Sequence, residues 1–356
     1  MCHSGFVQSH KKEKASMSEV SIIGVDLAKR FFQVHGALPD GNVAFRKKLS
    51  RSQFMKFLAE QPPCLIAMEA CATAHYWGRE ALGSGHEVRL IPPIYVKPFV
   101  KRQKNDAADA EAIVEAALRP TMRFVEVKSA DQQSLGLLFR TRELLVRQRT
   151  QLINALRGHL AEYGIVVAIG VRNVKVFQQV LLDHGTRLPK TVLSISGVYF
   201  EQIAALTEKV TELEIALRRE TARDGQATLL QTMPGIGPMS AAAIQAFAPP
   251  LENFARGRDF AAWLGLVPRQ HSSGGKDRLG RISKMGQRDI RRLLIIGAMS
   301  IVNWASRKGS RDSWLMRLLE SKPKMVVAVA LANKMARRLW AMCVKKEVYE
   351  IPILVA

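Results

Sequence analysis

Short apolar runs separated by turn-forming residues recur through the first third of the chain. Runs bounded by Gly, Pro, Asn or Asp are typical of strands, whereas apolar positions three or four residues apart are typical of helices. Strands are predicted at residues 22–26, 32–38, 43–49, 64–68 and 87–91. Helices are predicted at residues 52–60, 75–82 and 107–118. Residues 39–42 (Pro-Asp-Gly-Asn) supply a hairpin turn, and the whole order is β-β-β-α-β-α-β-α.

Leucines at heptad spacing mark the middle of the chain as helical. One stripe runs through Leu138, Leu145, Leu152, Leu156 and Leu160. A second seam steps by three and four residues through Ile203, Leu206, Val210, Leu213 and Leu217. Such seams favour two long helices that pair as a coiled-coil arm or a helical hairpin. Residues 164–197, between the seams, are assigned to helix and loop.

The last third opens with a glycine-rich turn and closes with two apolar helices. Residues 233–241 (Met-Pro-Gly-Ile-Gly-Pro-Met-Ser-Ala) resemble the turn of a helix-hairpin-helix element. The two helices are predicted at residues 291–305 and 325–345. Four segments follow from the whole pattern: a disordered extension at 1–18, an α/β domain at 19–127, a helical linker at 128–225 and a mainly helical domain at 226–356.

Composition adds a strong positive charge to this picture. The 356 residues include 53 Lys and Arg against 31 Asp and Glu, a formal net charge of +22. An excess of that size indicates a polyanionic partner such as nucleic acid. An anionic membrane surface would also attract it. However, the longest apolar run, near residues 293–302, is well short of the roughly 20 residues that span a bilayer.

Neither the cysteines nor the N-terminal residues indicate a zinc-binding or exported protein. The four cysteines form no Cys-x-x-Cys pair, and Cys64 and Cys71 have no histidine at ligand spacing. Buried thiols in a reducing cytoplasm are the better interpretation. Residues 1–14 are polar and basic and lack the apolar core of a signal peptide.

Four carboxylates of the α/β segment occupy positions that suit a metal site. Asp26 lies in the first apolar strand, and Glu69 follows the fourth. Asp106 and Asp109 lie three residues apart in an Ala-rich helix and therefore share one helical face. With the element order, this is the arrangement of a ribonuclease H-like fold. Such a cluster suits hard cations such as Mg²⁺, and two ions can clamp the attacking and leaving oxygens of a phosphodiester.

Each of these carboxylates also has an ordinary structural interpretation. An isolated acidic residue is usually solvated, and Asp106 and Asp109 suit a helix N-terminus, where the helix dipole favours negative charge. Asp26 is harder to explain in this way, since a charge in a buried strand is costly unless it is paired or bound to a metal. The four residues in this order, in a basic chain, favour the metal site.

Positive charge is concentrated between Arg256 and Arg292. This stretch holds ten Lys/Arg and three Asp/Glu, a net +7, and it surrounds Ser-Ser-Gly-Gly at residues 272–275. Ser/Gly runs are usually flexible loops, but the basic surroundings favour a loop that contacts phosphate. Spacing alone does not identify a serine nucleophile. The turn glycines Gly235 and Gly237 fit either a plain helix connection or a phosphate contact through backbone N–H groups.

The motifs, taken in order, resemble one family over nearly the whole chain from Val20. They are Gly-Val-Asp-Leu-Ala-Lys at 24–29, Met-Glu-Ala at 68–70, Lys-Asn-Asp-Ala-Ala-Asp-Ala at 104–110, Pro-Gly-Ile-Gly at 234–237, His-Ser-Ser-Gly-Gly-Lys at 271–276 and Gly-Arg-Ile-Ser-Lys at 280–284. This set is similar to that of the DEDD transposases of the insertion-sequence-110 family, nearest the 1111 subgroup.

The resemblance implies a RuvC-like N-terminal domain, a coiled-coil linker and a C-terminal transposase domain. It also implies site-specific DNA recombination that is guided by a structured bridge RNA from the mobile element itself. DNA and this RNA are then the expected partners, without a membrane, in the bacterial cytoplasm at the nucleoid. The leucine seams offer contacts for a homo-oligomer, a dimer or tetramer.

The same resemblance assigns roles to individual residues. The family's metal-binding tetrad, for which Mg²⁺ is the expected ion, corresponds to Asp26, Glu69, Asp106 and Asp109. Ser273 matches the family's nucleophile, which forms a phosphoserine link to DNA, and the adjoining Ser272 is the second choice. Contacts to nucleic acid are expected from Lys104, Gly235, Gly237, Arg269, Lys276, Arg278, Arg281 and Lys284.

Two other functions fit the residues taken alone. One is a junction-resolving nuclease of RuvC-like type that hydrolyses DNA with metal and water, and the other is a non-catalytic nucleic-acid-binding protein on the same scaffold. A covalent protein–DNA adduct distinguishes the recombinase from the nuclease. Metal-dependent cleavage excludes the non-catalytic protein.

Overall fold

The computed structural model describes residues 20–100, 106–184, 188–272, 276, 278–309 and 313–350, without the side chains of residues 106, 107, 184 and 313. The extension expected at residues 1–18 lies outside these ranges. The chain divides into two compact units, the first ending at Ser129 and the second beginning at Ala130. Each cluster of buried apolar side chains lies wholly within one unit.

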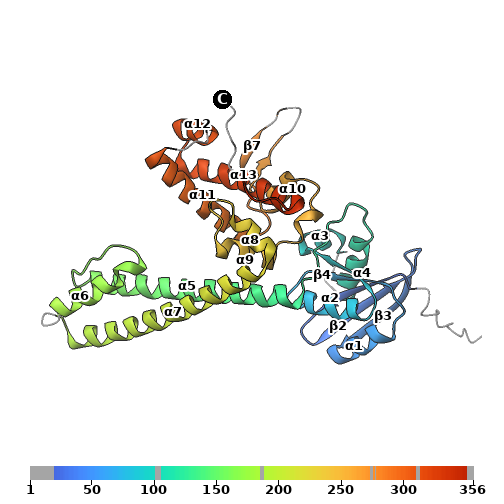
Figure 1. Ribbon diagram of the computed structural model, residues 1–356. Helices are drawn as coiled ribbons and strands as arrows, with labels where there is room; N and C mark the ends of the chain where they lie inside the picture. Colours follow the sequence, from blue (N-terminus) through green and yellow to red (C-terminus); the bar gives the residue numbers. More distant parts are fainter. Residues whose placement is uncertain are drawn as a thin grey trace, which may run out of the picture. The chain divides into compact units, whose positions relative to one another are not determined.

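A five-stranded mixed sheet forms the centre of the first unit (Figure 1). Its strands are β1 (Ile22–Leu27), β2 (Phe31–Ala37), β3 (Val43–Ser50), β4 (Leu65–Glu69) and β5 (Glu87–Ile91). In the order β3-β2-β1-β4-β5, the first three strands are antiparallel neighbours, whereas β4 runs parallel to β1 and β5 parallel to β4. All five predicted strands are confirmed, and the sheet is consistent with a ribonuclease H-like fold.

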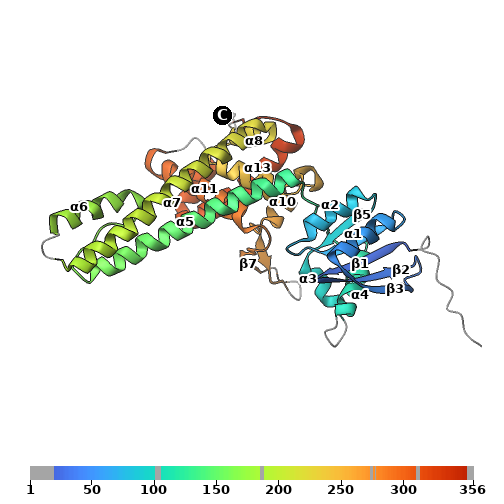
Figure 2. The same cartoon turned by 90° about the horizontal axis from the view of Figure 1, so that it is seen from below.

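Helices cover both faces of this sheet (Figure 2). One face carries α1 (Arg51–Glu60) and α2 (Ala74–Gly83), and the other carries α3 (Pro93–Val96), the 3₁₀ turn η2 (Lys97–Phe99) and α4 (Asp106–Ala117). On the first face the rings of Phe32, Phe54 and Trp77 meet edge to face. Beneath α4 the core consists mostly of alanine and branched aliphatic side chains, which let the helix lie close to the strands.

Local chemistry explains where two of these helices begin. The Ser50 hydroxyl accepts a hydrogen bond from the backbone N–H of Gln53, whose side chain accepts one from the N–H of Ser50, so a capping box starts α1. Helix α3 was not expected, because Pro92 and Pro93 were taken only as the end of a strand. Proline is also well suited to the first position of a helix, where its missing N–H is not needed.

Two long helices, α5 (Ala130–Ala161) and α7 (Lys190–Arg223), pack against each other in the second unit (Figure 1). Buried residues of α7 include Ile203, Val210 and Leu217, which lie at heptad spacing. The seam therefore packs within one chain, as a helical hairpin. The residues between the seams, assigned to helix and loop, include η3 (Val171–Asn173) and α6 (Val174–His184), whose Phe177 joins the core of the hairpin.

A cluster of four charged side chains fastens this hairpin to the rest of its unit. Arg142 of α5 donates to Glu143 at 2.6 Å and to Glu214 of α7 at 2.5 Å. Glu143 also accepts from Arg292 of α11 (Arg288–Lys308). Arg142 and Glu143 are largely buried, with side chains 19% and 15% exposed, so each depends on its partners to offset the loss of water.

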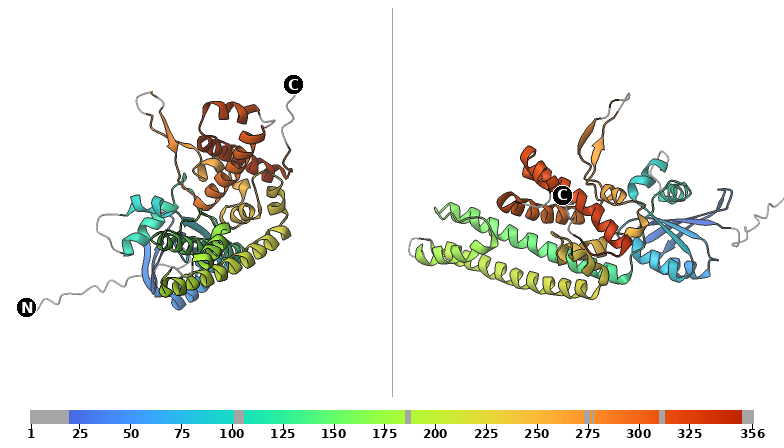
Figure 3. Two further views of the ribbon diagram at one scale, coloured as in Figure 1. Left: turned by 90° about the vertical axis from the view of Figure 1, so that its left-hand side faces the viewer. Right: turned by 45° about the horizontal axis from the view of Figure 1, so that its top comes forward.

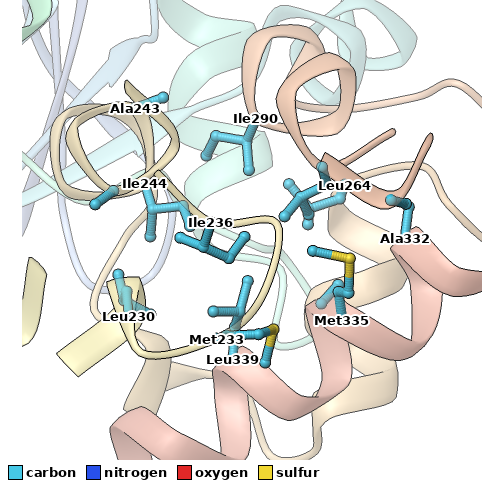
Figure 4. Packing of buried hydrophobic residues seen from close by; sticks show 14 of the residues in the cluster. Leu230, Met233, Ile236, Ala243, Ile244, Leu264, Ile290, Ala332, Met335 and Leu339 are labelled. Atoms are coloured by element: carbon cyan, nitrogen blue, oxygen red, sulfur yellow. The ribbon is translucent and has the colours of Figure 1, made fainter. Parts of the chain in front are cut away.

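The remainder of the second unit is mainly helical, as expected. Its elements are α8 (Gly225–Gln231), α9 (Pro238–Phe247), η5 (Leu251–Asn253), α10 (Gly257–Trp263), α11, α12 (Ser313–Ser321) and α13 (Lys324–Lys345). Figure 4 shows apolar side chains from α8, the following turn, α9, α11 and α13 meeting in one core. The two predicted closing helices correspond to α11 and α13. None of the described helices is long and apolar enough to cross a membrane.

A β-hairpin brackets the Ser/Gly segment of residues 272–275, of which only Ser272 is described. Its strands, β6 (Pro268–Gln270) and β7 (Leu279–Ile282), form an antiparallel pair that projects from the helices of its unit (Figure 3). Three exposed residues in β6 gave no apolar alternation from which a strand is predicted. Neither strand was predicted from the sequence, and the loop expected at residues 272–275 lies outside the described residues after Ser272.

Candidate active site

The parallel pairing of β1 and β4 brings the first two carboxylates to one edge of the sheet. Val25 pairs with Met68 in parallel register, so the next residues, Asp26 and Glu69, lie on neighbouring strands at their carboxyl ends. Both side chains are half-buried. The first and fourth strands thus place their acidic residues together, as the element order predicts.

Close packing against α4 determines the face on which these carboxylates lie. A Cβ atom on Gly24 would collide with the carbonyl oxygen of Ala110 and lie 2.6 Å from Cγ2 of Val114, both in α4. Alternate residues of a strand share a face, so Asp26 lies on the α4 side as Gly24 does. Ala67 belongs to the core beneath α4, which places Glu69 on that side as well.

Helix α4 supplies the other two acidic residues from its first turn. Asp106 begins the helix and Asp109 follows three residues later, and the helix dipole favours negative charge at this end. An ion pair of 2.8 Å between Arg46 of β3 and Glu111 holds this end of α4 against the sheet. The side chain of Asp106 lies outside the described residues.

Asp109 lies close enough to Glu69 for its charge to affect the Glu69 carboxyl. Burial raises the pKa of the Glu69 carboxyl above its ordinary value, and the charge of Asp109 raises it further. The structure therefore brings together two members of the predicted tetrad and places Asp26 on the adjacent strand. Two like charges held together in a partly desolvated place are a costly arrangement that a bound cation relieves.

The donors present fit a hard cation. Carboxylate oxygens are the ligands that Mg²⁺ prefers. The half-buried carboxylates of Glu69 and Asp109 can supply such oxygens, and a bound ion would offset the repulsion at Glu69. Among the described side chains, no group of three or more His, Cys, Asp or Glu is close enough to hold a metal. Asp26, Glu69 and Asp109 are all described, so these three side chains do not by themselves form a three-ligand cluster, and the side chain of Asp106 lies outside the described residues.

The strands β6 and β7 flank the candidate serines along the chain in the second unit. Ser272 is exposed, and its hydroxyl accepts a hydrogen bond of 3.4 Å from the backbone N–H of Arg278. His271 donates its N–H to the carbonyl of Arg278 at 2.8 Å, which continues the pairing of the two strands beyond β6. Ser273, the first choice for the nucleophile, lies outside the described residues.

Two glycines and an arginine fix the base of this hairpin. Cβ atoms on Gly265 and Gly286 would collide with the carbonyl oxygens of Met285 and Trp263, so the two segments can approach only because both residues lack side chains. Arg291 donates to the carbonyls of Leu264 at 2.8 Å and Met285 at 3.0 Å. Sequence reasoning missed this anchor; its only signal was a pair of isolated glycines flanking the motif.

The basic residues predicted to contact nucleic acid divide into those the structure describes and one it does not. Exposed side chains on the hairpin and its base belong to Arg269, Lys276, Arg278, Arg281 and Lys284. Arg269 donates to the carbonyl of Ser283 at 3.1 Å. Lys104 lies outside the described residues.

The two turn glycines between α8 and α9 have different surroundings. Gly235 has a positive φ of 85°, and a Cβ there would lie 3.0 Å from the carbonyl oxygen of Gly297 in α11. A Cβ on Gly297 would in turn collide with the carbonyl oxygen of Gly235. Gly237 is exposed and caps α9 with open space around it. Gly235 is thereby required for packing, and Gly237 is the better candidate for a phosphate contact.

Comparison with known families identifies the class of protein that these units form. Residues 23–165 match the DEDD domain of IS110-type proteins, described as Transposase. Residues 227–313 match the family described as Transposase IS116/IS110/IS902 family. The first match contains all four carboxylates. The second contains the turn glycines Gly235 and Gly237 and the β6–β7 hairpin.

Individual relatives extend over nearly the full chain. The "Probable family 20 transposase" of Pseudomonas aeruginosa is 46% identical over 333 residues, which is 93% of this chain and 98% of the relative. The "Transposase for insertion sequence element IS1328" of Yersinia enterocolitica is 40% identical over 94% of this chain and 99% of the relative. The corresponding transposase for IS1111A of Coxiella burnetii is 36% identical over 95% and 94%. The chain therefore belongs to the IS116/IS110/IS902 family of transposases, and DNA is its expected partner.

Proposed function

We propose that this transposase carries out site-specific recombination by cutting and rejoining DNA through a phosphoserine intermediate. The observation that supports it best is the convergence of Glu69 and Asp109, on β4 and α4, beside the strand that carries Asp26. We assign the metal tetrad to these three residues and Asp106, with Mg²⁺ as the ion. When bound, the ion neutralises charge that develops on the phosphate oxygens.

Ser273 is the proposed nucleophile. Its hydroxyl oxygen attacks phosphorus, a bridging P–O bond of the DNA breaks, and the leaving oxygen takes up a proton equivalent to the one that serine loses. One ester replaces another, so the strand can be rejoined without ATP. Lys276 and Arg278, which are exposed and follow Ser273 closely in the sequence, can neutralise the phosphate during the attack. Ser272 is the weaker candidate, since its hydroxyl already accepts from the N–H of Arg278.

We further propose that a structured RNA from the mobile element selects the DNA sites, as the family resemblance implies, with the 1111 subgroup as the nearest match. The net charge of +22 supports nucleic-acid partners, and RNA and DNA are both polyanions. The heptad seam of α7 is buried within the helical hairpin of α5 and α7. The dimer or tetramer that we propose therefore needs contacts other than Ile203, Val210 and Leu217.

A covalent adduct assay tests this function. The wild-type protein is incubated with labelled element-end DNA, the RNA and Mg²⁺, and adducts are resolved under denaturing conditions. Ser273→Ala and Asp109→Asn should both remove the adduct and recombination, while binding of RNA is retained. A matched control is Glu115→Gln, which neutralises an exposed charge on the same helix that pairs with Arg119.

Each alternative has its own outcome. Loss of the adduct only in Ser272→Ala identifies Ser272 as the nucleophile. An adduct that persists in both serine variants refutes serine catalysis at this motif. Cleavage without any adduct in the wild type indicates the junction nuclease instead. Full cleavage by Asp109→Asn would overturn the metal assignment.

A further inference from the structure

One row of polar residues crosses three strands and ends at the candidate metal site. Asp26 of β1 pairs with Gln33 of β2, which pairs with Lys48 of β3. Residues directly opposite in antiparallel strands point to the same face of a sheet. Asp26, Gln33 and Lys48 therefore share one face, although β3 is the edge strand farthest from β4 and β5.

The ion pair between Arg46 and Glu111 shows which face this is. Arg46 contacts α4 and lies two residues before Lys48, so Lys48 is also on the α4 side of the sheet. Gly24, two residues before Asp26, packs against α4 in the same way. Gly24 and Arg46 belong to one row across the strands, and Asp26 and Lys48 belong to the next row on the same face. In that row the side chain of Lys48 is exposed.

An aromatic ring completes this surface. Phe31, at the start of β2, lies two residues from Gln33 on the same face and is 46% exposed. The ammonium of Lys48 lies 5.0 Å from the centre of its ring. Lys29 and Arg30, in the turn that connects β1 to β2, are exposed beside it. An exposed ring among cations is the combination with which proteins bind single-stranded nucleic acid.

We propose that Phe31 and Lys48 bind the unpaired DNA strand next to the phosphate that is cut, with a base stacked on Phe31 and a phosphate held by Lys48. The inference rests on the proposed function, because it takes Asp26 as the place of the reacting phosphate. Two strand spacings separate Asp26 from Lys48, roughly 10 Å, which corresponds to about three stacked nucleotides. The row begins at the reacting phosphate, and the strand that reacts is DNA, so DNA is the occupant rather than the guide RNA.

The neighbouring lysine provides a matched control. Lys47 has the same charge and lies on the same strand, but it faces the α1 side, with its ammonium 4.8 Å from the ring centre of Phe45 and 5.0 Å from that of Phe57. A general effect of positive charge predicts equal losses from Lys47→Ala and Lys48→Ala. A bound strand on the α4 side predicts a loss for Lys48→Ala alone.

The test measures binding of a single-stranded DNA oligonucleotide to the full-length protein in EDTA, where no cleavage is needed. Lys48→Ala should reduce the slope of log affinity against log salt by about 0.7, and Lys47→Ala should leave it unchanged. Phe31→Ala and Phe31→Leu should weaken binding at least about five-fold. Phe31→Tyr should retain it, since the ring is kept, and matching thermal unfolding of all variants checks their folding.

Crosslinking identifies the occupant. DNA that carries 5-iodouracil at successive positions beside the cut site should crosslink to Phe31 within about three nucleotides of the cut phosphate. Equal salt slopes for Lys47→Ala and Lys48→Ala, together with no crosslink, would overturn the proposal, and a crosslink only to labelled guide RNA would replace DNA by RNA. Because binding is measured without metal, loss of adduct chemistry in Asp109→Asn and loss of strand binding in Phe31→Ala report separately on the two proposals.

Discussion

At the scale of single residues, the candidate site is defined by charges that the fold holds at a cost. Glu69 is half-buried at the end of β4, and both burial and Asp109 raise the pKa of its carboxyl. A residue kept in such surroundings without benefit to folding is a candidate for function. Asp40 provides a contrast, since hydrogen bonds from the backbone and side chain of Asn42 lower the pKa of its exposed carboxyl and stabilise a turn.

Removing one of the two charges should stabilise the metal-free protein. An acid whose pKa is higher in the folded chain than in the unfolded chain favours folding when protonated, and that contribution is lost as pH rises through the folded pKa. In EDTA at pH 8, Asp109→Asn should therefore raise the Tm by roughly 1–2 °C, a small gain because partial exposure screens the repulsion.

The gain should disappear below about pH 4, where Glu69 is protonated in both proteins. Differential scanning fluorimetry at the two pH values measures it, with Glu115→Gln as the control for loss of one charge from α4. A lower Tm for Asp109→Asn at pH 8 would contradict repulsion between the two carboxyls. Adding Mg²⁺ should raise the Tm of the wild type more than that of the variant.

At the scale of elements, the candidate site depends on the short distance between α4 and β1. Gly24 allows this distance because its absent side chain leaves room for the backbone of Ala110. The strand brings Asp26 and the helix brings Asp109, so any separation of the two elements separates the carboxylates. The Arg46–Glu111 ion pair attaches α4 a second time, to the edge strand β3.

Gly24→Ala should destabilise the protein by about 1–3 kcal/mol, the range observed for overpacking, and should reduce DNA cleavage more than it reduces DNA binding. Chemical denaturation measures the first effect, and adduct yield at saturating DNA measures the second. Gly83→Ala is the control, because a Cβ at that position in α2 meets nothing within 4 Å. Unchanged stability in Gly24→Ala would mean that α4 does not pack as closely as described.

At the scale of the whole molecule, the charge of +22 is spread over both units. In the second unit the exposed cations include those of the β6–β7 hairpin, and in the first they include Lys29, Arg30 and Lys48. Binding that depends on so many cations is mainly electrostatic and releases counterions from the nucleic acid.

Affinity for DNA should therefore fall steeply with salt. If six or more phosphates are neutralised, the loss between 50 mM and 200 mM salt is about a thousand-fold or more. Fluorescence anisotropy over that range, with wild-type protein and duplex element-end DNA, measures the slope. An affinity that hardly changes would show that the positive charge is not what binds DNA.

Apolar patterning missed the short helix α3 of the first unit. It was enough to predict the five strands and the helices α1, α2 and α4 of that unit, because these elements bury apolar side chains in the core clusters on the two faces of the sheet. The heptad seam of α7 was predictable for the same reason. The β6–β7 hairpin was not, since its strands are exposed and are held at the base by glycine contacts and Arg291, whose partners are backbone carbonyls distant in the sequence. The carboxylates were proposed as a site from their positions in the sequence, whereas Phe31 and Lys48 acquire their common face only through the pairing of β2 with β3.

The contact between Gly235 and Gly297 has a consequence for how this chain can vary by mutation. In most packed pairs, a larger residue on one side is tolerated once its neighbour becomes smaller. Neither partner here can become smaller, since each already lacks a side chain and meets the backbone of the other. A substitution at one of these positions therefore has no compensating substitution at the other, in natural variants or in a mutant library. Variation in the turn before α9 is then confined to the residues that surround the pair.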